Sequence, residues 1–250
     1  AQSSDRLFTV TQNSATIDAS GTGALTLTNT GSVAMTGTGS RVLTLSGTAV
    51  SEGALTRSAN GDYVVLVGYD AMLTTASLTS STSSTINRVI GRIAADNTVD
   101  TSTAFDGLSG ASPRGAASTN GTMMWATGGS GMIYTTFGST AAPVALSSLN
   151  SRMPRIFFGQ LYVTSGSGAN VGVNTVGNGL PTAAGATTTL LSGFSAQANL
   201  SNYGFVALDR DATPGIDTLY VADDRTTGGG VQRWRLSGTT WMYEGSFAAS

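Results

Sequence analysis

The chain has 250 residues, of which 40% are hydrophobic and 10% are charged, and its formal net charge is −2. All 12 basic residues are Arg, and the sequence contains no Lys, His or Cys. These absences exclude thiol nucleophiles, Schiff-base chemistry, imidazole bases, a Ser-His-Asp triad and zinc sites built from His or Cys. No basic block is present to neutralise a phosphate backbone, so we expect no nucleic acid partner.

Composition also bears on where the protein works. No apolar run reaches the length of about 18 residues that a membrane-spanning helix needs. The lack of Cys and the sparse charge favour a secreted, extracellular protein, although the lack of Cys would also fit any compartment in which thiols are not needed. Residues 1–4 are typical of a mature N-terminus left after removal of a signal peptide, and a trimmed chain would look the same.

The first 50 residues carry the pattern of short strands between tight turns. Two β-prone runs, residues 5–10 and 41–46, flank a segment in which apolar and polar residues alternate between glycines, as in residues 24–28 and 32–36. Alternation with a period of two, bounded by Gly and Asn, indicates half-buried antiparallel strands. We therefore expect residues 1–50 to form a first sheet, with a flexible low-complexity arm as the alternative.

From residue 51 onward the sequence contains an internal repeat. In each copy a turn containing Gly is followed, one polar residue later, by an apolar strand and then by small or acidic residues. The four copies are residues 60–68, 120–128, 158–166 and 215–223. A further predicted strand follows each copy, at residues 86–93, 131–137, 169–176 and 231–236. The uneven spacing between copies is what insertions between repeated strands would produce.

Such a repeat favours antiparallel sheets packed around an axis, because an isolated hairpin cannot bury its apolar face. At roughly 45 residues per blade, the sequence predicts an all-β, β-propeller-like array of about five antiparallel sheets. It would be a single domain over residues 1–250, with the repeated blades over residues 51–250. A solenoid would show a stricter period, and a sandwich has no reason to repeat one pattern. An incomplete ring stays open as well, completed by a second polypeptide, a further segment or self-association.

Six short motifs together resemble a group of secreted bacterial proteins with β-propeller-type repeats. They are SEGAL at residues 51–55, VGYD at 67–70, INRVIGRI at 86–93, GQLYV at 159–163, DTLYVADD at 217–224 and GGVQRW at 229–234. The resemblance covers most of residues 50–247 and implies export and a propeller-like fold. It carries over no activity.

The most distinctive single motif is an acidic loop, residues 209–217. Oxygen-bearing side chains stand at loop positions 1, 3, 5 and 9, and a Gly stands at position 7: Asp209, Asp211, Thr213, Asp217 and Gly215. Calcium takes roughly six to eight hard oxygen ligands, which a tight loop can supply. The spacing is similar to the calcium loops of FG-GAP propeller repeats, so the sequence predicts a Ca²⁺ site at these five residues. The alternative is a solvated turn whose aspartates hydrogen-bond their own backbone.

A carboxylate pair, Asp223 and Asp224, follows at the next strand end. Such a pair can perform acid–base chemistry or extend a metal site. The interpretation we favour is turn chemistry, with Arg225 or Arg233 compensating the charge.

Two functional hypotheses follow. The favoured one is a secreted, non-catalytic β-propeller module for extracellular binding, adhesion or surface assembly, stabilised by calcium, with carbohydrate or protein as its ligand. The alternative is a propeller-type hydrolase or lyase with a metal or carboxylate site at the centre of the ring, and no catalytic residue can be assigned to it. Acidic loops that converge on a central cavity would favour the enzyme, and loops at the rim would favour the binding module.

Overall fold

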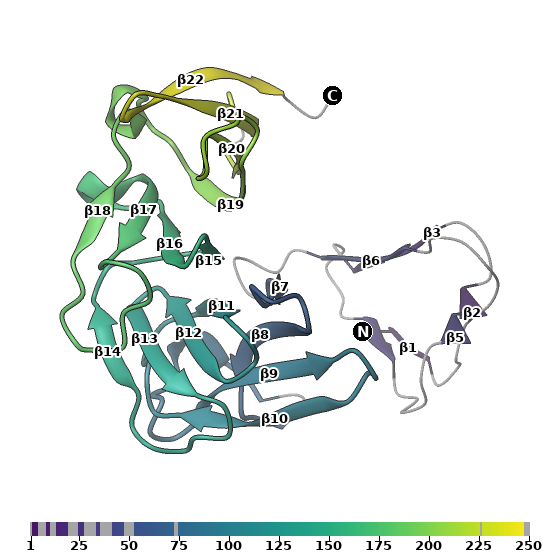
Figure 1. Cartoon of the computed structure of the whole chain (residues 1–250). Helices are drawn as coiled ribbons and strands as arrows, with labels where there is room; N and C mark the ends of the chain where they lie inside the picture. Colours follow the sequence, from purple (N-terminus) through teal and green to yellow (C-terminus); the bar gives the residue numbers. More distant parts are fainter. Residues whose placement is uncertain are drawn as a thin grey trace. The chain divides into compact units, whose positions relative to one another are not determined.

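The computed structural model describes residues 53–72, 75–225 and 227–247, together with six short strands within residues 2–47. The chain forms two compact units, Ala1–Val50 and Ser51–Ser250 (Figure 1). In the described part of the chain, the helical segments are three short 3₁₀ turns: η1 (Leu78–Ser80), η2 (Gly168–Asn170) and η3 (Phe194–Ala196). Among these residues no helix is long and apolar enough to cross a membrane.

The first unit contains strands that pair in parallel. They are β1 (Gln2–Ser4), β2 (Thr9–Val10), β3 (Ser14–Ala19), β4 (Leu25–Leu27), β5 (Ala34–Met35) and β6 (Val42–Gly47). β1 pairs with β4, β2 with β5 and β3 with β6, in three two-stranded sheets. The predicted antiparallel sheet over residues 1–50 is therefore wrong. Alternation identifies a strand but not its partner, and parallel pairing skips the neighbour across the turn.

The second unit consists of four antiparallel sheets of four strands, each following chain order. Sheet 1 contains β7 (Thr56–Arg57), β8 (Tyr63–Tyr69), β9 (Arg88–Ala94) and β10 (Val99–Phe105). Sheet 2 contains β11 (Pro113–Ser118), β12 (Met123–Gly128), β13 (Gly131–Thr136) and β14 (Val144–Ser147). Sheet 3 contains β15 (Pro154–Phe157), β16 (Gln160–Ser165), β17 (Gly172–Val176) and β18 (Thr188–Leu190). Sheet 4 contains β19 (Asn202–Leu208), β20 (Thr218–Asp223), β21 (Gly230–Ser237) and β22 (Thr240–Phe247).

The all-β prediction is confirmed, and the sequence repeat falls at one position in every sheet. Its four copies form β8, β12, β16 and β20, which are the second strands of the four sheets. The turn before the second strand has a Gly at positive φ in all four sheets: Gly61 at 85°, Gly121 at 82°, Gly159 at 72° and Gly215 at 141°. Gly takes this conformation without steric cost. That both units form one propeller-like domain stays a prediction.

Strand β12 shows how alternation builds the core between the sheets. Successive side chains of a strand point to opposite faces of its sheet. Met124 and Ala126 therefore pack toward sheet 1 in a cluster with Val65, whereas Trp125 packs toward sheet 3 in a cluster with Leu161. A third cluster of buried residues joins sheet 3 to sheet 4. Each sheet thus buries at least one face against its neighbour.

The first strands of the four sheets form the inner edge of the array. β11 packs against β7 and β8, β15 against β11 and β12, and β19 against β15 and β16. Figure 1 shows β7, β11, β15 and β19 on the inner side of an arc, with β10, β14, β18 and β22 on its outer side. Ala54, just before β7, packs against the cluster that joins sheets 3 and 4. The inner edge therefore curls back so that sheet 1 meets the later sheets.

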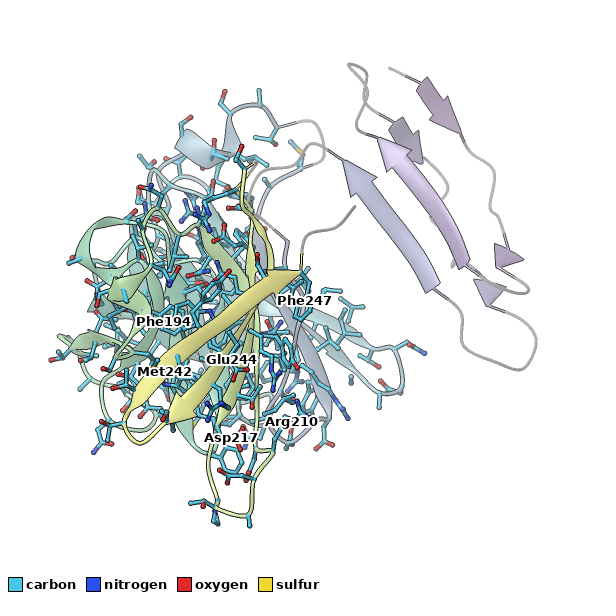
Figure 2. The ribbon with its side chains drawn as sticks, turned by 90° about the horizontal axis from the view of Figure 1, so that it is seen from above. Phe194, Arg210, Asp217, Met242, Glu244 and Phe247 are labelled. Carbon is cyan, nitrogen blue, oxygen red and sulfur yellow. The ribbon has the colours of Figure 1, made fainter. Side chains whose placement is uncertain are left out.

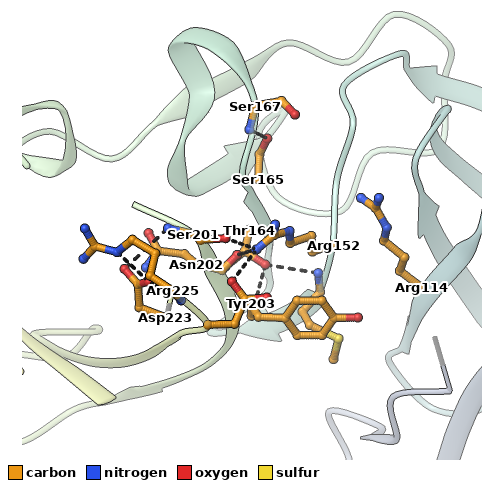
Figure 3. Close-up of polar contacts among 12 residues, drawn as sticks. Arg114, Arg152, Thr164, Ser165, Ser167, Ser201, Asn202, Tyr203, Asp223 and Arg225 are labelled. Carbon is orange, nitrogen blue, oxygen red and sulfur yellow. Dashed lines mark hydrogen bonds and ion pairs between the residues drawn. The ribbon is translucent and has the colours of Figure 1, made fainter. Parts of the chain in front are cut away.

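Arginine side chains from sheet 1, from sheet 2 and from the segment before sheet 3 reach the start of the following sheet. The donor–acceptor pairs are Arg88 Nη2 to Ala111 O at 3.4 Å, Arg114 Nη1 to Ser151 O at 3.3 Å and Arg152 Nη1 to Asn202 O at 3.1 Å. Figure 3 shows Arg152 beside Ser201, Asn202 and Tyr203. The planar guanidinium presents several donors in a fixed geometry, which suits one side chain to several backbone acceptors.

Truncation of Trp125 tests the packing between sheets 2 and 3. The indole is 1% exposed, and its Nε1 donates to Pro181 O at 2.8 Å. We expect Trp125→Ala to lower the free energy of unfolding by about 3–5 kcal/mol, because a cavity and an unpaired carbonyl remain. Met72→Ala, which removes a side chain that is 85% exposed, should change it by less than about 0.5 kcal/mol. Denaturant unfolding measures both, and equal losses in the two variants would contradict this packing.

Candidate metal centre

The acidic loop joins the first two strands of sheet 4. β19 ends at Leu208 and β20 begins at Thr218. The Asp217 amide donates to Leu208 O at 3.0 Å and closes the base of the loop. Figure 2 shows Asp217 and Arg210 together at one end of sheet 4, away from Phe247 near the end of β22. Loop residues 209–217 are thus anchored at both ends, by β19 before them and by β20 after them.

Three of the five predicted ligands come together in this loop. Asp209, Asp211 and Asp217 each offer a carboxylate oxygen, and these atoms lie within 4.8 Å of one another. Asp209 and Asp211 are exposed, and Asp217 is half-buried. Hard carboxylate oxygens are the donor type that Ca²⁺ and Mg²⁺ prefer. The cluster can therefore hold a metal ion.

Backbone amides of the same loop donate to these carboxylates. The Thr213 amide donates to Asp211 Oδ1 at 2.7 Å, and the Gly215 amide donates to Asp209 Oδ2 at 3.2 Å. Thr213 and Gly215 are thus placed at the cluster through their N–H groups, and their roles as metal ligands stay a prediction. Amide donors of this kind also characterise a solvated Asp turn.

Asp217 is the most heavily hydrogen-bonded member of the cluster. It accepts from the Thr218 hydroxyl at 2.6 Å and from the backbone amides of Arg210 and Asp211 at 2.7 Å each. The Thr218 hydroxyl, followed by the Arg210 amide, holds the pKa of Asp217 below its ordinary value. The lowered pKa means that these bonds stabilise the loop above the ordinary carboxyl pKa of about 3.9. That contribution is lost as the pH falls through the lowered value.

Arginine side chains beside the cluster lower its affinity for a metal ion. A hollow of about 320 Å³ next to the loop is lined by Arg210, Arg233 and Arg235 as well as by Asp211 and Asp217. The Nε atoms of Arg233 and Arg235 lie 3.2 Å and 2.7 Å from the two Glu244 carboxylate oxygens, which offsets part of their charge. Arg210 forms no ion pair within the described residues. It therefore opposes cation binding most directly.

The neighbouring carboxylates Asp223 and Asp224 face different partners. Asp223 is buried, and its two oxygens accept from Arg225 Nε at 2.8 Å and Gln232 Nε2 at 2.7 Å. Asp224 is exposed, and its Oδ1 lies 3.5 Å from Arg152 Nη1. Figure 3 shows the Asp223–Arg225 pair beside Ser201 and Asn202. Arg225 compensates Asp223 as the turn interpretation predicts, whereas the partner of Asp224 is Arg152 from the lead into sheet 3.

One feature that the sequence patterns did not identify is a cavity of about 520 Å³ at the inner edge of the array. It is lined by residues 57–61, 155–157 and 205–206, from sheets 1, 3 and 4. The signal in the sequence was Arg155, one of several arginines spaced two to four residues apart. Its neighbour Arg152 turns instead to the entry of sheet 4, so spacing alone could not separate the two roles.

The Asp223 and Asp224 pair allows a matched test of burial. We expect Asp223→Ala to lower the free energy of unfolding by about 1–3 kcal/mol, because Gln232 and Arg225 lose a buried acceptor. Asp224→Ala breaks a solvent-exposed ion pair and should cost less than about 1 kcal/mol. Thermal and denaturant unfolding of both variants measure the difference. If Asp224→Ala cost more than Asp223→Ala, the assignment of Asp223 as the structural member would be wrong.

No protein-family model matches the chain, and neither a curated protein nor a solved structure is similar to it.

Proposed function

We propose that this protein is a secreted, non-catalytic β-propeller-like module for extracellular binding, adhesion or surface assembly, with a calcium ion in the Asp209–Asp217 loop. The observation that carries the proposal is the separation of the acidic loop from the inner cavity. Residues 209–217 do not contribute to the described lining of that cavity, which includes no Asp or Glu. A central carboxylate or metal site, which the hydrolase or lyase hypothesis requires, has no support in this lining.

The propeller-like arrangement is supported by three features of the second unit. Its sheets are four-stranded meanders, their first strands lie at the inner edge, and consecutive sheets pack face to face. Blades of a propeller share these features. Export is supported by composition, since the chain has no Cys and is only 10% charged. Binding proteins of the extracellular space do not need a reactive side chain, which suits a chain without His or Lys.

Calcium is the proposed ion because the cluster offers hard oxygen ligands in a short loop. Asp209, Asp211 and Asp217 would supply carboxylate oxygens, and Thr213 and Gly215 would complete the set with a hydroxyl or carbonyl oxygen. Three carboxylates and the adjacent Arg210 make weak binding the expectation, at the level of extracellular modules. The ion would rigidify the loop between β19 and β20.

Calorimetry with Ca²⁺ tests this site. We expect one ion to bind with a Kd of about 10⁻⁴–10⁻³ M. At ten times the Kd it should raise the free energy of unfolding by about 1.4 kcal/mol. Asp209→Ala should weaken binding at least about tenfold, whereas Asp70→Ala, which removes an exposed carboxylate outside the loop, should leave it unchanged. An unmodified protein that neither binds Ca²⁺ nor gains stability from it refutes the calcium site.

The open face of sheet 4 supports the proposal of self-association. Phe205 faces sheet 3, so Val206 points to the opposite side of β19. Val231 and Phe247 are paired across β21 and β22 on that same side, and Met242 lies on it farther along β22, opposite Arg235. Phe247 is 65% exposed and Met242 is 49% exposed. Figure 2 shows Met242, Glu244 and Phe247 along β22.

A second copy of this chain is the proposed occupant of that face. Arg235 and Glu244 place both signs of charge beside the apolar residues. A copy related by a twofold axis can therefore match each charge with its opposite while it covers the exposed apolar side chains of this face. Such an interface would complete the open side of the array.

Light scattering after size-exclusion chromatography tests self-association. We expect a dimer whose population rises with concentration. Met242→Asp should shift it to monomer, because it places an unpaired charge in the proposed interface. The control Met72→Asp adds the same charge at another exposed Met and should leave the dimer intact. A monomer at every concentration, or a complex only with a different polypeptide, would contradict the second copy as occupant.

A further inference from the structure

The cavity at the inner edge of the array contains two positive charges and no negative one. Its volume of about 520 Å³ falls within the range of roughly 300–1,000 Å³ that is usual for small-molecule sites. Arg57 and Arg155 are the ionisable residues of its described lining. They come from the first strands of sheet 1 and sheet 3.

Arg155 is a desolvated cation without a protein partner in the described part of the chain. Its Nε is buried and has no hydrogen-bond partner, and no carboxylate forms an ion pair with it. Burial lowers the pKa of the Arg155 guanidinium, although Arg stays charged in proteins. Arg155 is half-buried, and no group of the described residues compensates the hydration that its guanidinium loses. A bound anion would repay it.

Arg57 is exposed, is oriented by one hydrogen bond and keeps donors free. Its Nε donates to Gly61 O at 2.9 Å. The guanidinium lies so close over Gly61 that a Cβ at this position would stand 2.6 Å from Nη2. No carboxylate of the described residues pairs with it. The turn between β7 and β8 thus holds a second guanidinium at the cavity, with its terminal nitrogens available for an acceptor.

The remaining wall is largely apolar. Ile156 and Phe157 follow Arg155 on β15, and Phe205 and Val206 come from β19. The rings of Phe157 and Phe205 meet edge to face with centroids 5.8 Å apart. A ligand that satisfies both kinds of wall has an anionic head and an apolar, preferably aromatic, body.

We infer that this cavity binds a small organic anion, with Arg155 and Arg57 on its carboxylate and Phe157 and Phe205 against its apolar body. A guanidinium donates two parallel hydrogen bonds to a carboxylate, which gives both strength and orientation. The inference deepens the binding function proposed above by giving it a ligand class. It depends on neither calcium nor self-association.

Phenylacetate is a suitable probe, and its binding can be followed by NMR through the few Arg side chains of the protein. Only 12 Arg side chains contribute Nε–H resonances to a ¹⁵N-correlated NMR spectrum, and the Arg155→Gln variant assigns the Arg155 resonance. We expect titration with phenylacetate to shift the Arg155 and Arg57 resonances in a saturable way. Neutral phenylacetamide, which keeps the ring but loses the charge, should bind at least about tenfold more weakly.

Variants separate this site from a general effect of charge. Arg155→Gln and Arg57→Gln should each weaken phenylacetate binding by about tenfold or more. Arg210→Gln makes the same charge change in the acidic loop and should leave the affinity unchanged. Equal binding of the acid and the amide, or unchanged binding by Arg155→Gln, would overturn the inference. Inorganic sulfate that binds as tightly as phenylacetate would overturn the organic part of the ligand class.

A stability measurement distinguishes a ligand-binding Arg155 from a structural one. Arg155→Met replaces the unpaired charge by an apolar side chain of similar length. Because a partly desolvated, uncompensated charge is removed, its midpoint of thermal unfolding should equal or exceed that of the unmodified protein, while phenylacetate binding is lost. A large fall in the midpoint would instead assign Arg155 to the fold. The calcium and light-scattering results stay independent of this outcome.

Discussion

The packing of each four-stranded sheet against the next holds the second unit together, because a small sheet alone cannot bury its apolar faces. Strand β12 shows this dependence within six residues. Met124 and Trp125 are neighbours in sequence, yet they belong to different core clusters on opposite sides of sheet 2. A sheet in the middle of the array therefore shapes two interfaces at once, and the position of the inner cavity follows from how these interfaces turn the first strands toward one another.

Arginine side chains make several of the polar contacts across the same interfaces. Arg88, Arg114 and Arg152 each reach the segment that enters the following sheet. The side chain of Arg88 is completely buried, which is tolerable because Ser81 and Ile86 supply carbonyl acceptors. Lysine carries a compact charge with no fixed fork and could not span several backbone carbonyls in this way. Arg155 differs because no such acceptors surround it, and this contrast makes it a candidate for a bound ligand.

How much could be predicted depended on whether the information was local. Turn glycines and alternation located the second and third strands of all four sheets, because a turn and its strand are encoded within about ten residues. The grouping of Asp209, Asp211 and Asp217 was predictable for the same reason. Which strands pair with each other could not be predicted in this way, as the parallel pairs of residues 1–50 show. The register of the strands could not be predicted either, because an irregularity between Arg233 and Trp234 pairs Trp234 with Tyr243. The stacking partner of Trp234 is also non-local: it is Phe194, a residue outside any strand.

The placement of the tryptophans determines what an optical experiment on this protein can see. All three Trp residues lie in the later interfaces: Trp125 between sheets 2 and 3, and Trp234 and Trp241 between sheets 3 and 4. The cluster between sheets 1 and 2 contains none. The cluster between sheets 1 and 2 is separate from the two clusters that contain the tryptophans, so β8, β9 and β10 can part from sheet 2 while the later interfaces stay packed. Tryptophan fluorescence would not detect that event. The fluorescence of Tyr63 and Tyr69, which lie in sheet 1, would report it.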